Sequence, residues 1–471
     1  NLTGGSGDNN FLVSGWTGNA TLIGSGGSGD RVVYQSNADI ALSNTNLSDS
    51  LGLNLVLATI EIAELSGGTS DNNFNLSGWM GSGSINGALG NDSLTIVSNS
   101  NFVLGDTSLL IGTKAIALSS VEVSELTGGA AANTFTVSDW TGTGTLTGGG
   151  GADKLVATKT GTVILKDSQL SSADGMEVSL SGFTTANVSG GNGNDTFDVS
   201  AWTGGGSLSG NGFNDLDRVI VRGDGVLVLT NTSLARSGLP TLTLASIEAA
   251  DLSGGVGDDT FNVSGWMGSG SLSGASGTNT LLASKNFDFT LNHVSVTSSD
   301  GMSLGLASIS IANLIGGTAN NTFDVSGWDG TGALTGAGGT GDKVVYAGGG
   351  NLRLSNTQLS DTFGPSFTLA TIELAELTGN ADANTFDLTG WTGSGSIAGG
   401  AERDIVIASG NFNYLLSDTS LTIGSKVMNL SGVEVAQLTG GASANTFTVG
   451  AWTGGGALTG GGGNDVVNAA K

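Results

Sequence analysis

Cysteine is absent from the 471 residues, and the chain has only 2 prolines and 1 histidine, His293. Without cysteine, neither a disulfide framework nor a zinc–thiolate site can form, and no Cys–His catalytic pair can be built. Basic residues are also scarce, because 14 Lys and Arg oppose 40 Asp and Glu and leave a formal net charge of −26. Such a chain repels nucleic-acid phosphates and anionic lipids, so we expect no nucleic-acid partner.

Long hydrophobic runs are missing as well, since none approaches the ~18 apolar residues of a membrane-spanning helix. We therefore expect no membrane insertion of this segment. Glycine, in contrast, is abundant, with 83 residues, while 38% of the chain is hydrophobic. That much apolar surface can form a core, and the glycine predicts many turns. The expected product is a folded chain dense in strands and turns.

Eight tryptophans reveal an internal repeat, because successive indoles follow one another at a nearly constant spacing of roughly 60 residues. They are Trp16, Trp79, Trp140, Trp202, Trp266, Trp328, Trp391 and Trp452. Each follows a phrase such as Asn133-Thr-Phe-Thr-Val-Ser-Asp-Trp140. The pattern begins and stops inside the repeat, so we expect the chain to be a segment of a longer polypeptide.

Each repeat contains a shorter echo. Leu126-Thr-Gly-Gly, followed by Asn133, is matched further along the same repeat by Leu146-Thr-Gly-Gly, followed by Asp153. A third phrase, Leu-x-Asx-Thr-x-Leu, begins at a similar interval after the second, as at Leu104. Alternating and β-branched segments bounded by Gly, Ser and Asx indicate strands, and no segment has a sustained helical period.

These periods predict an all-β fold, a right-handed parallel β-helix (β-solenoid) with about three rungs of ~20 residues in each repeat. We expect residues 1–471 to form a single continuous solenoid, with repeats at approximately 1–63, 64–124, 125–186, 187–250, 251–312, 313–375, 376–436 and the partial 437–471. Stacked rungs bury the inward side chains that one rung alone leaves exposed.

An Asn or Asp lies two residues before the phenylalanine of each first rung. These positions are Asn9, Asn72, Asn133, Asp195, Asp259, Asn321, Asn384 and Asn445. Turn chemistry explains them, since Asx side chains hydrogen-bond nearby backbone and tolerate left-handed angles. The second rung has an Asx at the matching position, as at Asp92.

Calcium binding is the alternative interpretation of these residues. The segments Gly148 to Asp153, Gly190 to Asp195, Gly254 to Asp259 and Gly460 to Asp465 resemble the glycine- and aspartate-rich nonapeptide of RTX-type secreted proteins. The resemblance implies calcium as a cofactor, with Asp153, Asp195, Asp258, Asp259 and Asp465 as candidate ligands. The RTX nonapeptide repeats in immediate tandem, whereas a whole rung or more separates one of these segments from the next. We otherwise expect no cofactor.

The tryptophans have two interpretations of their own. Each indole follows a Ser-Gly-like corner, which favours a ring that covers a corner of the core. An exposed row of indoles, one in every three rungs and ~14 Å apart, would instead provide a contact surface for glycans or for a neighbouring rod.

No repeat concentrates unusual residues in one place. Glu61, Glu64, Glu122 and Glu125 recur at the same phase, which indicates a solvated stripe and not a single catalytic acid pair. His293 occupies a turn position that is Asn or Asp in other repeats. We therefore expect no enzymatic activity and no catalytic residues.

The phrase Leu-Thr-Gly-Gly-x-x-x-Asn-Thr-Phe-x-Val-Ser-Gly-Trp-Thr-Gly resembles the repeat region of giant bacterial surface proteins, the haemagglutinin-like and autotransporter-like β-solenoid adhesins. This resemblance implies an extracellular or cell-surface filament segment that acts as a structural spacer in an adhesin stalk, surface fibre or matrix. Its implied partners are neighbouring copies or further repeats of the same fibre and a glycan or host surface. The RTX-like resemblance implies the alternative function, a calcium-dependent extracellular binding module.

Overall fold

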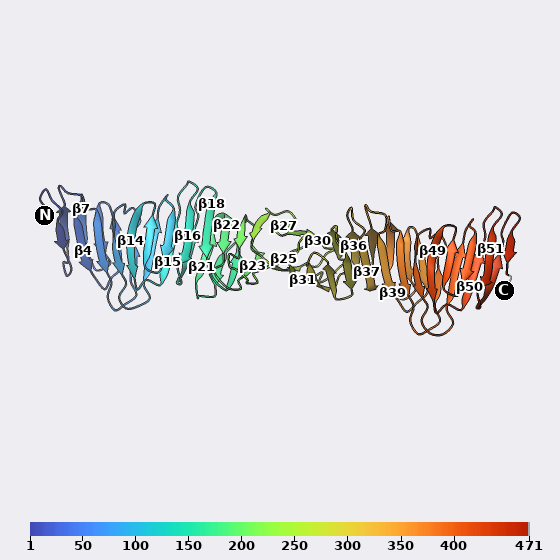
Figure 1. The fold of residues 1–471 in the computed structure, drawn as a ribbon. Coiled ribbons are helices and arrows are strands. Elements are labelled where there is room, and N and C mark those ends of the chain that lie inside the picture. The colour runs from blue at the N-terminus through green and yellow to red at the C-terminus, as the bar shows by residue number, and fades with distance from the viewer. Residues whose placement is uncertain (470–471) are drawn as a thin grey trace. The chain divides into compact units, whose positions relative to one another are not determined.

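The computed structural model describes residues 1–469 of the chain. Within them lie 53 β-strands and no helix. The contacts divide the chain into two compact units. Unit 1 holds Asn1–Val221 and Gly238–Ile247, and unit 2 holds Arg222–Ser237 and Glu248 onward. Within each unit the strands lie side by side in long succession (Figure 1). The predicted all-β solenoid is thereby confirmed.

The strands of unit 1 are short and regularly spaced. They are β1 (Leu2–Thr3), β2 (Asn10–Leu12), β3 (Asn19–Ile23), β4 (Arg31–Gln35), β5 (Ile40–Ser43), β6 (Asn46–Asp49), β7 (Asn54–Ala58), β8 (Ile62–Ser66), β9 (Asn73–Asn75), β10 (Ser82–Asn86), β11 (Ser93–Val97), β12 (Phe102–Gly105), β13 (Ser108–Ile111), β14 (Lys114–Ser119), β15 (Val123–Thr127), β16 (Thr134–Asp139), β17 (Thr143–Thr147), β18 (Asp153–Thr158), β19 (Thr162–Lys166), β20 (Gln169–Ser172), β21 (Glu177–Ser181), β22 (Phe183–Ser189), β23 (Thr196–Ala201), β24 (Gly205–Ser209), β25 (Arg218–Arg222) and β28 (Leu242–Ala245).

Unit 2 repeats the same pattern. Its strands are β26 (Val226–Thr230), β27 (Ser233–Arg236), β29 (Ala249–Ser253), β30 (Thr260–Gly265), β31 (Ser269–Ser273), β32 (Thr280–Ser284), β33 (Phe289–Asn292), β34 (Ser295–Ser298), β35 (Ser303–Ala307), β36 (Ile311–Ile315), β37 (Thr322–Gly327), β38 (Thr331–Thr335), β39 (Lys343–Ala347), β40 (Leu352–Ser355), β41 (Gln358–Asp361), β42 (Ser366–Ala370), β43 (Leu374–Thr378), β44 (Thr385–Asp387), β45 (Ser394–Ala398), β46 (Ile405–Ser409), β47 (Tyr414–Ser417), β48 (Ser420–Ile423), β49 (Lys426–Ser431), β50 (Val435–Thr439), β51 (Thr446–Ala451), β52 (Gly455–Thr459) and β53 (Val466–Asn468).

The shorter sequence repeat within each repeat corresponds to two strands that stack on each other in a fixed register. In all eight repeats the apolar anchor of the first rung pairs in parallel with the anchor of the second rung. The pairs are Leu2↔Leu22, Leu65↔Ile85, Leu126↔Leu146, Val188↔Leu208, Leu252↔Leu272, Leu314↔Leu334, Leu377↔Ile397 and Leu438↔Leu458. Parallel pairing in this register places like side chains above one another and forms continuous apolar columns.

The third part of each repeat differs from the predicted third rung. In the second repeat, β12, β13 and β14 form an antiparallel meander in which Leu104 pairs with Leu109. The second-rung anchor Ile85 therefore stacks on Leu118 of β14, and not on Leu104. The phrase Leu-x-Asx-Thr-x-Leu is a hairpin, because its Asx-Thr pair forms a two-residue turn. Spacing alone cannot distinguish this reversal from another rung.

Each repeat crosses between two facing sheets an odd number of times. In unit 1, sheet A contains β9, β11 and β15, and sheet B contains β8, β10 and the meander β12 to β14. The chain passes from β8 through β9, β10, β11 and the meander to β15, which begins the next repeat in the other sheet. Equivalent residues of successive repeats therefore lie on opposite sides. In unit 2 the meander β33 to β35 and the meander β40 to β42 show the same alternation.

Aromatic contacts join one repeat to the next. The first strand of each meander pairs with the Phe-bearing strand of the following repeat, as β12 does with β16 at Phe102↔Phe135. Those two ring centroids lie 4.9 Å apart, and the rings of Phe289 and Phe323 stack at 5.8 Å. Phe135 and Phe323 are fully buried. These contacts extend the core across the repeat boundary.

Candidate functional site

Six of the eight indoles cover corners of the core, between the first-rung and second-rung strands. Side-chain exposure is 4% or less from Trp79 to Trp391, whereas Trp16 is 45% exposed and Trp452 is half-buried. The glycine two residues after each buried indole packs against its ring edge. A Cβ added to Gly142 would lie 2.5 Å from Cζ2 of Trp140. The Trp-x-Gly phrase is therefore a packing requirement.

The exposed row of indoles is not formed. Besides being buried, successive tryptophans alternate between two corners, because each repeat begins in the other sheet. In unit 1, Trp79 lies between β9 and β10 and leads from sheet A to sheet B, while Trp140 leads from sheet B to sheet A. Tryptophans on one corner are two repeats apart, which is seven strands or roughly 34 Å, not ~14 Å.

The first-rung Asx residues hold the backbone of the glycine-rich turn before them. The side chain of Asn72 accepts a hydrogen bond from the N–H of Gly68 at 2.9 Å, and Asn133 accepts from Gly129 at 2.9 Å. The same bond, from the residue four positions earlier, recurs at Asp195, Asp259, Asn321, Asn384 and Asn445. Asn9 is the exception, since its buried Oδ1 has no such donor. These residues do stabilise the turn, but not as predicted: the donor lies four residues before the side chain and not two residues after it, and none of the seven residues has a left-handed φ.

The second-rung Asx residues tie adjacent rungs together. Oδ1 of Asp92 accepts the backbone N–H of Asn72 at 2.7 Å, and the same bond occurs in every repeat. Its members are Asn9 to Asp30, Asn72 to Asp92, Asn133 to Asp153, Asp195 to Asp217, Asp259 to Asn279, Asn321 to Asp342, Asn384 to Asp404 and Asn445 to Asp465. We call this series the Asx ladder.

The calcium candidates already bind backbone donors. Both carboxylate oxygens of Asp195 accept N–H groups, from Gly161 at 2.5 Å and Gly191 at 2.8 Å. Asp259 is held in the same way by Gly225 and Gly255. A cation at either carboxylate would have to share each oxygen with a backbone N–H group.

The other three candidates each offer one oxygen to the neighbouring rung. Asp258 accepts the N–H of Thr278 at 2.6 Å, and Asp153 and Asp465 belong to the Asx ladder. Within residues 1–469, no three His, Cys, Asp or Glu side chains are grouped as metal ligands usually are. The structure therefore distributes the five candidates over several rungs and does not gather them around one point.

Some of the recurring glutamates belong to the ladder rather than to a purely solvated stripe. Oε2 of Glu122 accepts the N–H of Asp92 at 2.9 Å, and Glu61 accepts the N–H of Asp30 at 2.9 Å. Glu373 and Glu434 make the same bond to Asp342 and Asp404. His293 is exposed, and its Nδ1 lies 3.0 Å from Oδ1 of Asp329.

Two ion pairs, each with a buried lysine, connect the tryptophan corner to the meander and were missed by sequence reasoning; the Asp174 side chain of the first pair is 34% exposed. Lys159 donates to the carbonyl of Trp140 and to Oδ2 of Asp174, the latter at 2.8 Å. Lys285 likewise bonds to Asp300 at 2.6 Å, with both side chains 3% exposed. Burial alone would raise the pKa of the Asp300 carboxyl, but hydrogen bonds from Lys285 and Ser298 hold it below its ordinary value. In the third and fifth repeats, therefore, an ion pair fills the space beside the indole.

A tyrosine and an aspartate connect the same two segments in other repeats. Tyr34 donates its hydroxyl to Asp49 at 2.6 Å, and Tyr346 donates to Asp361 at 2.9 Å. Burial, together with the adjacent Asp49 carboxylate, raises the pKa of Tyr34 to about 12. Both phenols therefore remain donors at neutral pH.

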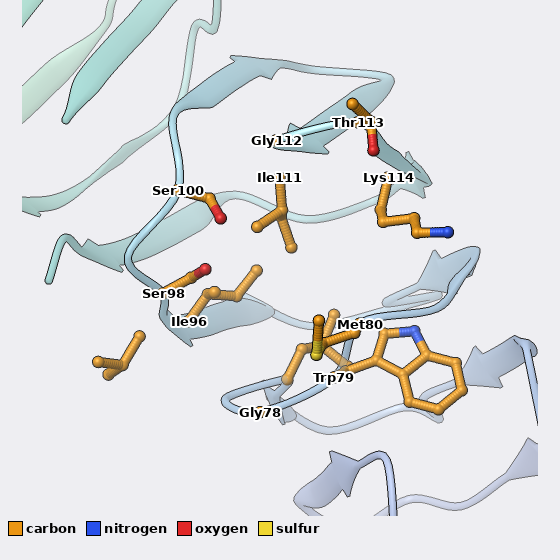
Figure 2. A pocket seen from close by; sticks show the side chains of 12 residues that line it. Gly78, Trp79, Met80, Ile96, Ser98, Ser100, Ile111, Gly112, Thr113 and Lys114 are labelled. Atoms are coloured by element: carbon orange, nitrogen blue, oxygen red, sulfur yellow. The ribbon is translucent and has the colours of Figure 1, made fainter.

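In the second repeat neither pair is present, and a pocket of about 510 Å³ remains (Figure 2). Ser98 follows Trp79 at the same spacing at which Lys159 follows Trp140, and Thr113 occupies the position of Asp174. Figure 2 shows the two hydroxyl side chains and Lys114 around a space that Ile96 and Ile111 also line. The volume is that of small-molecule sites, so the pocket could accept a compact ligand with an apolar body.

No protein-family model matches the chain, and no curated protein shows significant sequence similarity to it. The described residues also contain no helix of the length and apolarity needed to cross a membrane. The function must therefore be inferred from the ladder, the core and the pocket themselves.

Proposed function

We propose that the chain is a structural spacer, a segment of a long extracellular or cell-surface filament such as an adhesin stalk, surface fibre or matrix component. One observation supports this above all: the same parallel register between first and second rungs recurs in all eight repeats. A solenoid built from equivalent neighbours gains stability by addition and grows in length with each repeat. Its partners would be neighbouring copies or further repeats, with a glycan or host surface contacted by the filament.

The polar groups of the repeat support the same proposal. In the Asx ladder, aspartate and asparagine side chains accept hydrogen bonds from backbone N–H groups of adjacent rungs. These bonds stabilise the stack without a ligand. The surplus of acidic residues keeps such a filament soluble and discourages association with nucleic acid.

Filament length provides the test. Seven strands per repeat, shared between two sheets, correspond to a rise of roughly 17 Å at the usual strand spacing. Deleting residues 313–436, which comprise two whole repeats, should shorten the particle by roughly 34 Å. Electron microscopy or small-angle scattering of the full and shortened chains measures this directly. A change confined to particle width would contradict the spacer proposal.

The second candidate function is a calcium-dependent binding module. It is supported only by the acidic, glycine-rich segments that resemble the RTX nonapeptide. Circular dichroism and thermal unfolding with calcium and with a chelator distinguish the two. We expect equal strand content and equal melting in both conditions, because Asp195 and Asp259 already bind backbone donors. An unfolded chain in chelator would favour the calcium module.

A further inference from the structure

Several second-rung aspartates, Asp153 among them, keep one carboxyl oxygen buried and without a hydrogen-bond donor, and four of them lie beside a backbone carbonyl. These four are Asp30, Asp92, Asp342 and Asp404, each no more than 1% exposed. Oδ1 of each accepts the ladder N–H at 2.7 Å, but Oδ2 has no hydrogen-bond partner. A buried carboxylate oxygen left unpaired is costly, so its surroundings need an explanation.

The group that faces Oδ2 is itself an acceptor. At Asp92, Oδ2 and the carbonyl oxygen of Ser120 lie 2.4 and 1.8 Å from the same point, the position a Cβ of Gly87 would occupy. The corresponding carbonyls are those of Thr59, Thr371 and Gly432 beside Asp30, Asp342 and Asp404. Among the described residues, no backbone N–H donates to any of these four carbonyls.

The residues that carry these four carbonyls have left-handed backbone angles, which orient each carbonyl toward the aspartate. Ser120 has φ 48°, Thr59 has φ 52° and Thr371 has φ 51°, which are unfavourable angles for such residues. The fourth residue, Gly432, has φ 62°, so the left-handed turn recurs beside all four aspartates. Two acceptors are thus held against each other, and only a hydrogen atom between them would turn the contact into a bond.

The fifth repeat shows what the position requires. There the ladder residue is Asn279, and its Nδ2 donates to the carbonyl of Ser308 at 3.0 Å. Ser308 is the left-handed residue of that turn, with φ 55°. Nδ2 and this carbonyl flank the Cβ position of Gly274 at 2.2 and 2.3 Å, as Oδ2 and the Ser120 carbonyl flank that of Gly87. The amide therefore supplies the donor that an ionised aspartate lacks.

The charges around three of these aspartates oppose ionisation. Burial raises the pKa of Asp92, and the nearby carboxylates of Glu122 and Asp71 raise it further, against the bond from Asn72. The pKa of Asp342 is raised by burial and by Glu373.

Asp404 follows the same pattern, because burial raises its pKa first and Glu434 and Glu402 add to the effect. Two cations next to the ladder form ion pairs with other carboxylates: Arg31 binds Glu64 at 3.1 Å and Lys343 binds Glu376 at 2.9 Å. In the fifth repeat, where the donor is an amide, Ser310 stands at the position of the ladder glutamate.

We propose that Asp92, Asp342 and Asp404 are carboxylic acids in the folded protein, each donating its Oδ2–H to the carbonyl of the left-handed residue in the next turn. The ladder then contains proton-dependent bonds in three repeats and a proton-independent bond at Asn279. The neighbouring glutamates Glu122, Glu373 and Glu434 stay ionised and accept the backbone N–H of each acid. Proton uptake by the three aspartates therefore tightens the filament, and proton loss loosens it.

The sign of the pH effect follows from this assignment. Because the folded pKa values of Asp92, Asp342 and Asp404 lie above the unfolded value of about 3.9, the folded state binds more protons over the interval between the two. The stabilisation is complete below the unfolded pKa and is lost as the pH rises through the folded pKa. Stability should therefore fall from mildly acidic to alkaline pH.

Reciprocal substitutions in the full chain test the proposal. We expect Asp92→Asn to raise the melting temperature at about pH 8 by about 2–4 °C and to change it little at about pH 4.5. Asn279→Asp should lower it by a similar amount at the higher pH only. Asp139→Asn, at an exposed position with the same charge change, controls for net charge and should not alter the pH profile.

A direct readout accompanies the melting curves. Infrared spectra at mildly acidic pH, above the range in which exposed carboxyl groups titrate, should show a carboxylic-acid carbonyl band that disappears when Asp92, Asp342 and Asp404 become asparagine. Equal shifts of Asp92→Asn at both pH values, or no acid band in the wild-type chain, would overturn the proposal. So would stabilisation of the wild-type chain by calcium at about pH 8 that Asp92→Asn abolishes, because a metal ion would then supply the missing positive charge.

Discussion

Replacing Phe135 with alanine should open the solenoid locally and leave distant repeats intact. The ring is fully buried and contacts Phe102 at 4.9 Å and Phe183 at 5.1 Å. Loss of a buried phenylalanine side chain costs about 3–5 kcal/mol. Two aromatic contacts, each contributing about 0.5–1.5 kcal/mol, place this site toward the upper end. In a stack of nearest-neighbour interfaces this energy is lost from the adjoining rungs.

Native-state hydrogen exchange followed by mass spectrometry measures the effect. Opening of β12, β16 and β18 should become roughly a hundred-fold to several thousand-fold more frequent, since about 1.4 kcal/mol corresponds to a factor of ten. Strands of unit 2 such as β38 should exchange as before. Phe135→Leu, which retains most of the apolar volume, is the matched control and should cost less than about 1.5 kcal/mol. Uniform acceleration over the whole chain would refute the additive solenoid.

Two further substitutions test the tryptophan corner and the pocket. Gly142→Ala places a methyl group 2.3 Å from the Glu122 carbonyl oxygen and against the indole of Trp140. We expect the free energy of unfolding, measured with denaturant, to fall by about 1–3 kcal/mol. Gly5→Ala, whose added Cβ has no atom within 4 Å, is the control and should leave it unchanged. Ser98→Lys combined with Thr113→Asp should recreate the ion pair of the third repeat, in which the lysine is buried. A double-mutant cycle should give a favourable coupling of about 0.5–3 kcal/mol. Purely additive single substitutions would show that the pocket cannot hold the pair.

The third segment of the repeat shows where sequence reasoning stopped. Leu104 and Leu109 recur with the spacing of a rung anchor, yet they face each other across a hairpin. Both arrangements bury the same leucines at the same phase, so periodicity cannot separate them. The structure distinguishes the two arrangements because Ile85 pairs with Leu118 and not with Leu104. This pairing joins distant segments and forms only when the meander is folded.

The repeat itself, the register between first and second rungs and the all-β character were determined by sequence alone, because they arise from local turn chemistry and from apolar residues at constant phase. Tertiary structure decided which side of the solenoid each tryptophan occupies, since that depends on an odd number of sheet crossings per repeat. It also decided that Oδ2 of Asp92 faces the carbonyl of Ser120, and that the second repeat keeps a pocket where others hold an ion pair. These features arise between segments that are distant in the sequence, and only the stacked chain brings such segments into contact.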